Sequence, residues 1–102
     1  MIVRHIVMWK FADQPKEARV EVARSLAAAL EGLVGEIPGL RSVTAEPDTL
    51  DEVGSWDLIL IADLEDQAAL DAYQVHPAHV AVAGMIKEAA VARSAVDYHV
   101  AD

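Results

Sequence analysis

Two segments of the sequence, residues 2–11 and 56–64, are apolar on both faces of the strand that each is expected to form. Successive side chains of a strand point to opposite sides, so an antiparallel sheet with one solvated face alternates apolar and polar residues. Neither segment alternates in this way. In the first, the two sets are Val3, His5, Val7, Trp9 and Phe11, and Ile2, Ile6 and Met8. In the second, they are Ile59 and Ile61, and Trp56, Leu58, Leu60, Ala62 and Leu64. Both faces of the sheet that these strands form must therefore be covered.

A long helix is expected between the first strand and the middle of the chain. Gln14 and Pro15 occupy the positions of an N-cap and a first helical residue. Apolar side chains then recur at three- and four-residue spacing, which is typical of one face of an amphipathic helix: Val20, Ala23, Ala27, Leu30, Val34 and Ile37. Gly35 and Pro38-Gly39 end this helix.

The remaining elements complete a recognisable order. Residues 40–45 and 93–100 are expected to be strands, and residues 46–55 a loop. Asp66 caps a short helix that His76-Pro77 breaks at Val75, and a second helical segment continues from Pro77 to about residue 90. The order is strand, helix, strand, strand, helix, strand. It predicts one ferredoxin-like α+β domain over residues 1–102, with a four-stranded antiparallel sheet in βαββαβ order.

The two-sided strands also predict an assembly. In this fold they form the central pair, and the helices cover only one face of the sheet. A second copy packed face to face is the simplest cover for the other, so we expect a homodimer that closes an α/β barrel. Exposing Leu58, Leu60 and Leu64 would forgo about 1.5–3 kcal/mol for each side chain. The alternative is a monomer whose loops fold over the sheet, but no loop is long or apolar enough.

Charge and composition exclude several classes of partner. The chain has 17 acidic and 8 basic residues and a formal charge of −9, which argues against a nucleic-acid or anionic-membrane partner. It has no cysteine, which excludes disulfides and thiolate chemistry. The longest charge-free run, residues 72–86, is shorter than the roughly 20 apolar residues that a membrane span needs. A cytoplasmic location is the default expectation.

The residues around the helix break could carry chemistry. The chain reversal at Pro77 can bring the Tyr73 hydroxyl and the His79 ring towards one space, where histidine accepts a proton and the phenol donates to a carbonyl oxygen. A structural interpretation competes with this one. His76 is then an ordinary helix cap, and His5, Tyr73 and His79 are core residues with satisfied polar ends.

A metal site can also be imagined from His76 and His79 with Asp57 or Asp97. Their spacing across a proline turn lacks the specificity of a metal motif. The five glycines are scattered and form no phosphate-binding loop. We therefore expect neither a metal nor a cofactor.

Three segments resemble the stress-responsive A/B barrel (Dabb) family. They are His5 to Phe11, Tyr73 to Val80 with its His-Pro-x-His block, and Val96-Asp97-Tyr98. The resemblance extends over essentially the whole chain. It implies a ferredoxin-like fold that dimerises through its sheets into an α/β barrel.

The resemblance also implies a pocket. In the olivetolic acid cyclase branch of this family, a Tyr and a His close a polyketide chain by aldol condensation without a cofactor, and Tyr73 and His79 match them. His5 and Asp97 match further pocket positions. Leu30 and Asp57 stand where that branch has a pocket tyrosine and a pocket histidine, and Trp9 replaces an aliphatic residue. The candidate catalytic residues are Tyr73 and His79, and the predicted lining is His5, Val7, Trp9, Leu30, Asp57, Ile59, His76 and Asp97.

Three functions follow, and whether the chain is an enzyme stays open at this point. The first is a homodimeric Dabb protein with a small apolar-lined pocket for a hydrophobic or phenolic metabolite and no assigned reaction. The second is a cofactor-independent polyketide cyclase or aldol-type lyase that uses Tyr73 and His79. The third is a cofactor-free monooxygenase, which rests on analogy of fold alone.

Overall fold

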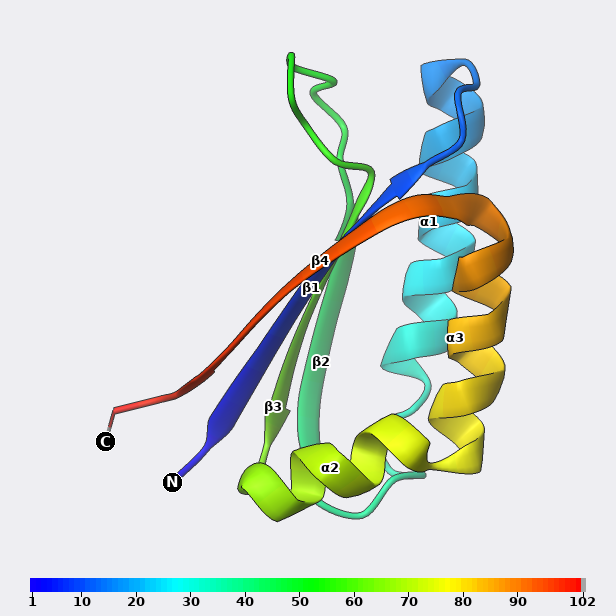
Figure 1. The fold of residues 1–102 in the computed structure, drawn as a ribbon. Coiled ribbons are helices and arrows are strands. Elements are labelled where there is room, and N and C mark those ends of the chain that lie inside the picture. Colours follow the sequence, from blue (N-terminus) through cyan, green and yellow to red (C-terminus); the bar gives the residue numbers. More distant parts are fainter. Residues whose placement is uncertain (102) are drawn as a thin grey trace.

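The computed structural model describes residues 1–101, and its elements follow the predicted order (Figure 1). The strands form one four-stranded antiparallel sheet in the order β2-β3-β1-β4, so the two-sided strands β1 and β3 are the central pair, as predicted. The fold is ferredoxin-like. The elements are β1 (Val3–Phe11), α1 (Lys16–Glu31), β2 (Leu40–Pro47), β3 (Leu58–Leu64), α2 (Gln67–Val75), α3 (Pro77–Ala89) and β4 (Ala90–His99).

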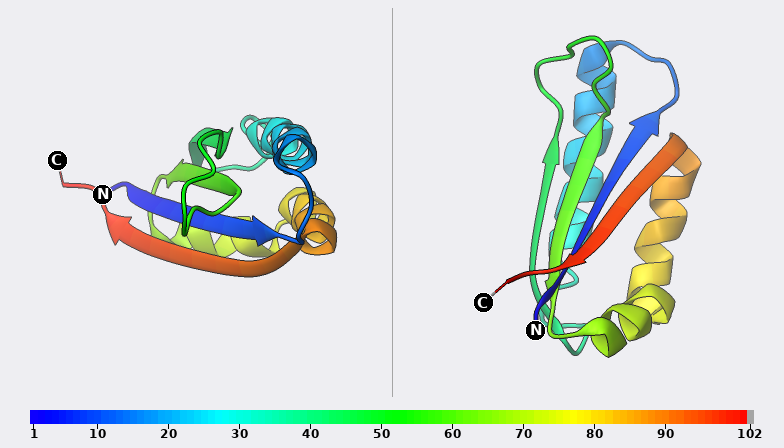
Figure 2. Two further views of the ribbon diagram at one scale, coloured as in Figure 1. Left: turned by 90° about the horizontal axis from the view of Figure 1, so that it is seen from above. Right: turned by 60° about the vertical axis from the view of Figure 1, so that its left-hand side comes forward.

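The helices lie on one side of the sheet and leave the other side bare. In Figure 1, α1 and α3 run along one face and α2 crosses below it, and the right-hand view of Figure 2 looks onto the bare strands. The covered face carries the odd-numbered residues of β1 and the leucines of β3, which pair as Val7 with Leu60 and Trp9 with Leu58. The three leucines are at most 2% exposed in the single chain. The expectation that a second copy must cover these leucines is therefore wrong, because the helices of the same chain already cover them.

The bare face belongs to the other apolar set. Ile6 pairs with Ile61 and Met8 with Ile59, so the central strands present aliphatic side chains there. The edge strand β4 adds Val96, which is 63% exposed and lies opposite Ile6. An uncovered apolar face thus exists, but isoleucine, methionine and valine form it.

The end of α1 differs from the prediction. The helix starts at Lys16, with Pro15 as N-cap rather than first helical residue, and stops at Glu31 rather than near Ile37. Beyond Glu31 the amides of Leu33 and Val34 donate to carbonyls three residues back, a tighter winding that turns Val34 out to solvent. Leu33 and Ile37 remain buried in the turns that follow.

The break between α2 and α3 follows the prediction. The Asp66 side chain accepts from the Ala69 amide at 2.8 Å and begins α2. The His76 Nδ1 atom accepts from the Ala78 amide at 3.1 Å, and Pro77 is the first residue of α3. Among the described residues, no helix combines the length and the apolar character needed to cross a bilayer.

Candidate functional site

A cavity of about 440 Å³ lies between the covered face of the sheet and the helices. This size is within the range of small-molecule sites. Trp9 forms part of the wall and does not fill the cavity. The lining residues are His5, Val7 and Trp9 of β1, Leu30 of α1, Leu60 of β3, His79, Ala83, Ile86 and Lys87 of α3, and Ala90, Val91, Ala92 and Arg93 of β4.

Tyr73 lies against the two histidines of the cavity wall. It is the fully buried aromatic residue of α2. Its ring centroid is 4.3 Å from that of His79 and 6.0 Å from that of His5. Its hydroxyl is buried and has no hydrogen-bond partner among residues 1–101. Burial raises the pKa of Tyr73 to about 12, so the phenol stays protonated and able to donate.

His79 is held as a neutral base. Its Nδ1 atom lies 3.2 Å from the carbonyl oxygen of Gln74, so Nδ1–H donates and Nε2 keeps its lone pair. Burial lowers the pKa of His79, and the positive charge of Arg93 acts in the same direction. An uncharged imidazole beside a protonated phenol can accept a proton and stabilise a developing oxyanion.

His5 is the second buried imidazole of the wall. Its Nδ1 atom is bonded to the carboxylate of Asp97, which lies opposite it on β4. The His5 side chain is 3% exposed and that of Asp97 is 41% exposed. Such a carboxylate fixes the ring orientation and the tautomer of a histidine, and it directs Nε2 away from the strand pair.

Four predicted pocket residues do not line the cavity, and one of them is Asp97, which is bonded to His5 as described above. Ile59 lies on the bare face, where it pairs with Met8. His76 is the cap of α3 described above, which is the structural interpretation of that residue. Asp57 is buried just before β3, where its carboxylate accepts from the Phe11 amide at 2.7 Å and from Arg19 at 2.6 Å. Asp57 precedes the first residue of β3, Leu58, and lies outside the cavity lining.

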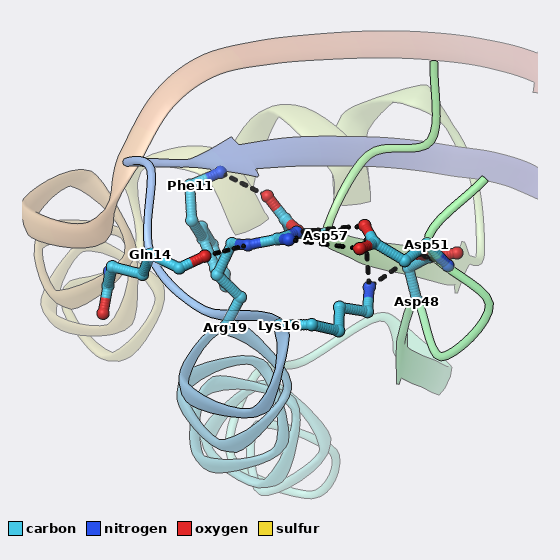
Figure 3. A network of polar contacts seen from close by, with 7 residues as sticks. All are labelled: Phe11, Gln14, Lys16, Arg19, Asp48, Asp51 and Asp57. Carbon is cyan, nitrogen blue, oxygen red and sulfur yellow. Dashed lines mark hydrogen bonds and ion pairs between the residues drawn. The ribbon is translucent and has the colours of Figure 1, made fainter. Parts of the chain in front are cut away.

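Asp57 belongs to a polar network that joins the loop of residues 48–57 to the start of α1 (Figure 3). Arg19 also donates to the Gln14 carbonyl at 2.9 Å. Lys16 donates to Asp48 at 2.7 Å and lowers the pKa of that carboxyl group. We call Asp57, Arg19, Lys16 and Asp48 the loop clamp. Its groups are satisfied by one another, which is what a structural network requires.

A model of the family described as Stress responsive A/B Barrel Domain matches residues 3–100. The chain belongs to the Dabb family. No curated protein matches this Dabb chain.

Solved structures share the Dabb fold. A dimeric protein of unknown function and ferredoxin-like fold from Bacteroides fragilis is 28% identical, with a TM-score of 0.87 over 97% of this chain and 96% of that one. A dimeric ferredoxin-like protein of unknown function from Thermobifida fusca is 30% identical, with a TM-score of 0.81 over 98% and 92%. A hydroxynitrile lyase from Passiflora edulis is 16% identical, with a TM-score of 0.76 over 99% and 94%, and shares the fold.

The sequence interpretation of this Dabb chain missed the far end of the cavity. Ala83, Ile86 and Lys87 follow His79 by four, seven and eight residues, so they share its side of α3. That spacing was a usable signal. Arg93 was not visible in this way, because only the return of β4 along β1 brings it to the cavity.

No group of three or more His, Cys, Asp or Glu side chains within residues 1–101 is arranged to hold a metal ion. The two aspartates considered for such a site have other partners. Asp57 is held by Arg19, and Asp97 is bonded to His5.

Proposed function

We propose that this Dabb protein is a homodimer whose cavity binds a small, largely apolar metabolite that carries an oxygen acceptor. One observation carries the proposal: the Tyr73 hydroxyl is buried without a partner beside the two histidines of the cavity wall. An unpartnered buried donor costs about 1–3 kcal/mol, so its presence needs an explanation. In this proposal, a ligand oxygen that enters the cavity beside His5 and His79 accepts from that hydroxyl.

The homodimer is supported by the bare face of the sheet. Ile6, Ile61 and Val96 lie together there without cover from any helix. Contiguous apolar patches of this kind mark interfaces. The relatives from Bacteroides fragilis and Thermobifida fusca are described as dimeric. Two such faces packed together would close an α/β barrel and place each cavity on the outer, helical side.

Light scattering on the purified chain tests the assembly. We expect twice the 11.0 kDa of one chain. Val96→Glu places a charge on the bare face, opposite Ile6, and should yield the 11.0 kDa species. Val53→Glu is the matched control, because Val53 is fully exposed in the loop. A wild-type chain that is monomeric at every concentration contradicts the homodimer.

Binding can be tested with a matched pair of apolar probes, 4-phenylbutan-2-one and butylbenzene. The ketone offers an acceptor to Tyr73 and the hydrocarbon does not. We expect the ketone to bind about threefold to tenfold more tightly, and Tyr73→Phe to remove this preference while leaving butylbenzene affinity unchanged. Titration calorimetry measures both affinities. If neither probe binds, or if the preference survives in Tyr73→Phe, the proposed site is wrong.

The state of His79 favours a second candidate function, cofactor-independent proton transfer of the aldol or cyclase type. Its Nδ1–H is held by Gln74 and its pKa is lowered, so Nε2 can remove a proton from the carbon beside a carbonyl group. The Tyr73 hydroxyl then donates to the enolate oxygen that forms. The broken bond is C–H, the proton moves to Nε2, and the electron pair moves onto the carbonyl oxygen.

This step can be followed without knowing the substrate. In D₂O, the wild-type chain should accelerate exchange of the α-hydrogens of 4-phenylbutan-2-one, measured by proton NMR. His79→Gln should abolish the acceleration, and His99→Gln, an exposed histidine of β4, should retain it. Binding of the ketone without exchange would contradict the enzymatic function and leave the binding function standing.

A further inference from the structure

We infer that the metabolite of this cavity has an anionic head group, a carboxylate or a phosphate ester, held between Lys87 and Arg93 at the cavity mouth. The inference rests on the proposed function and names the class of ligand. The apolar body of the ligand lies deeper, against Val7, Leu30 and Leu60.

Positive charge is scarce in this protein, and three of its cations are paired with carboxylates. The chain has 8 Lys and Arg residues against 17 Asp and Glu residues. Arg4 donates twice to Asp63, at 2.8 and 2.9 Å. Lys16 and Arg19 are engaged in the loop clamp. The other five form no ion pair within residues 1–101, and of these five only Lys87 and Arg93 line the cavity.

These two cations line the same cavity, from different elements. Lys87 lies in the last turn of α3 and Arg93 near the start of β4, and both side chains reach solvent. They are therefore at the mouth, whereas Val7, Leu30 and Leu60 are buried. An apolar chamber with cations at its entrance is complementary to an amphipathic anion.

No carboxylate in the lining opposes that charge. The ionisable lining residues are two histidines, Lys87 and Arg93. Asp97 is bonded to His5 and is not part of the lining. The charge of Arg93 also acts inside the cavity, since it contributes to the lowered pKa of His79. In a chain with a formal charge of −9, a wall without a carboxylate and with two unpaired cations favours an anionic ligand.

A matched pair of ligands isolates the head group. The probes are 6-phenylhexanoate and its uncharged amide, 6-phenylhexanamide, titrated by calorimetry at low and high salt. For the wild type we expect the carboxylate to bind about tenfold more tightly than the amide, with the difference shrinking as salt rises. Lys87→Gln and Arg93→Gln should each weaken carboxylate binding about threefold to tenfold and leave amide binding unchanged.

Arg24→Gln is the control, because it removes an equal charge from an exposed position of α1 outside the cavity lining. It should leave both affinities as they are. A third probe, 6-phenylhexyl phosphate, distinguishes the two head groups. The preferred anion is the one that binds the wild type more tightly and loses more affinity in a variant that combines Lys87→Gln and Arg93→Gln.

The failures are distinguishable. Equal binding of carboxylate, phosphate and amide by the wild type overturns the anionic head group but supports an apolar-ligand site. An equal loss in Arg24→Gln shows a general charge effect and also overturns the inference. If no probe binds, the proposed function fails together with the inference.

Discussion

Two polar clusters lie at different places on the same sheet, and they differ in how well their groups are satisfied. In the loop clamp, the Asp57 carboxylate has two donors and each cation has a carboxylate partner. At the cavity, the Tyr73 hydroxyl beside the wall histidines has no partner, and Lys87 and Arg93 form no ion pair within the described residues. Both clusters contain ionisable side chains, so composition alone does not separate them.

This difference supports a structural role for the loop clamp and the proposed ligand-binding role of the cavity. A buried polar group that is fully paired stabilises one arrangement of the chain. A buried polar group without a partner costs stability and persists where another molecule supplies the partner. The following variants test this distinction.

The largest effect is expected from Asp57→Ala. The substitution leaves the buried Phe11 amide without an acceptor, which costs about 1–3 kcal/mol, and the loss of Arg19 pairing adds to that cost. Urea denaturation at one fixed protein concentration measures the free energy of unfolding. Asp51→Asn keeps a residue type that tolerates the left-handed backbone of this exposed position (φ 57), where the contacts with Arg19 are 3.4–3.5 Å, so it should change the free energy of unfolding by less than about 0.5 kcal/mol. If both variants change the free energy of unfolding by similar amounts, the loop clamp has no special structural role.

Tyr73→Phe should have a small effect of opposite sign. It removes a hydroxyl that has no partner and keeps the packing of the ring, so the ligand-free chain should be equally stable or more stable by up to about 1 kcal/mol. The same denaturation assay applies. If Tyr73→Phe instead lowers the free energy of unfolding by more than about 1 kcal/mol, the hydroxyl has a hydrogen-bond partner in solution. The contrast between the two clusters would then disappear.

The smallest expected effect is the pH dependence of the free energy of unfolding that His79 causes. Burial lowers the pKa of His79, so the unfolded chain, with the ordinary value of 6.5, binds the proton more readily than the folded chain. The free energy of unfolding should therefore be independent of this group above pH 6.5 and should fall as the pH drops below it. His79→Gln should flatten that fall, measured by thermal unfolding between neutral pH and about pH 5. His99→Gln is the control, and an equal slope in wild type and His79→Gln would contradict burial of the imidazole.

The sequence was sufficient for the order and pairing of the elements. The paired sets of β1 and β3, the Asp66 cap and the His76-Pro77 break each leave a local pattern, and the structure confirms them. The sequence did not predict which of the two apolar sets the helices cover. The leucine and isoleucine sets are similarly hydrophobic, so only the packing of α1 and α3 decides between them.

The site was predictable where its residues repeat along one element. His5, Val7 and Trp9 share a strand face, and Ala83 and Ile86 share the side of α3 that carries His79. Asp57 was assigned wrongly because its direction depends on the Phe11 amide and on Arg19, which are 46 and 38 residues away. Contacts between distant segments leave no periodic signal in a single sequence.

The two faces of the edge strand β4 serve different parts of the proposed function, the cavity on the helical side and the dimer interface on the bare side. Asp97 and Arg93 point towards the helices, and Val96, between them in sequence, points to the bare face opposite Ile6. If a ligand bound on the helical side changed the conformation of β4, it would also change the affinity of the two copies for each other. By thermodynamic linkage, dimerisation would then change the affinity for that ligand by the same factor.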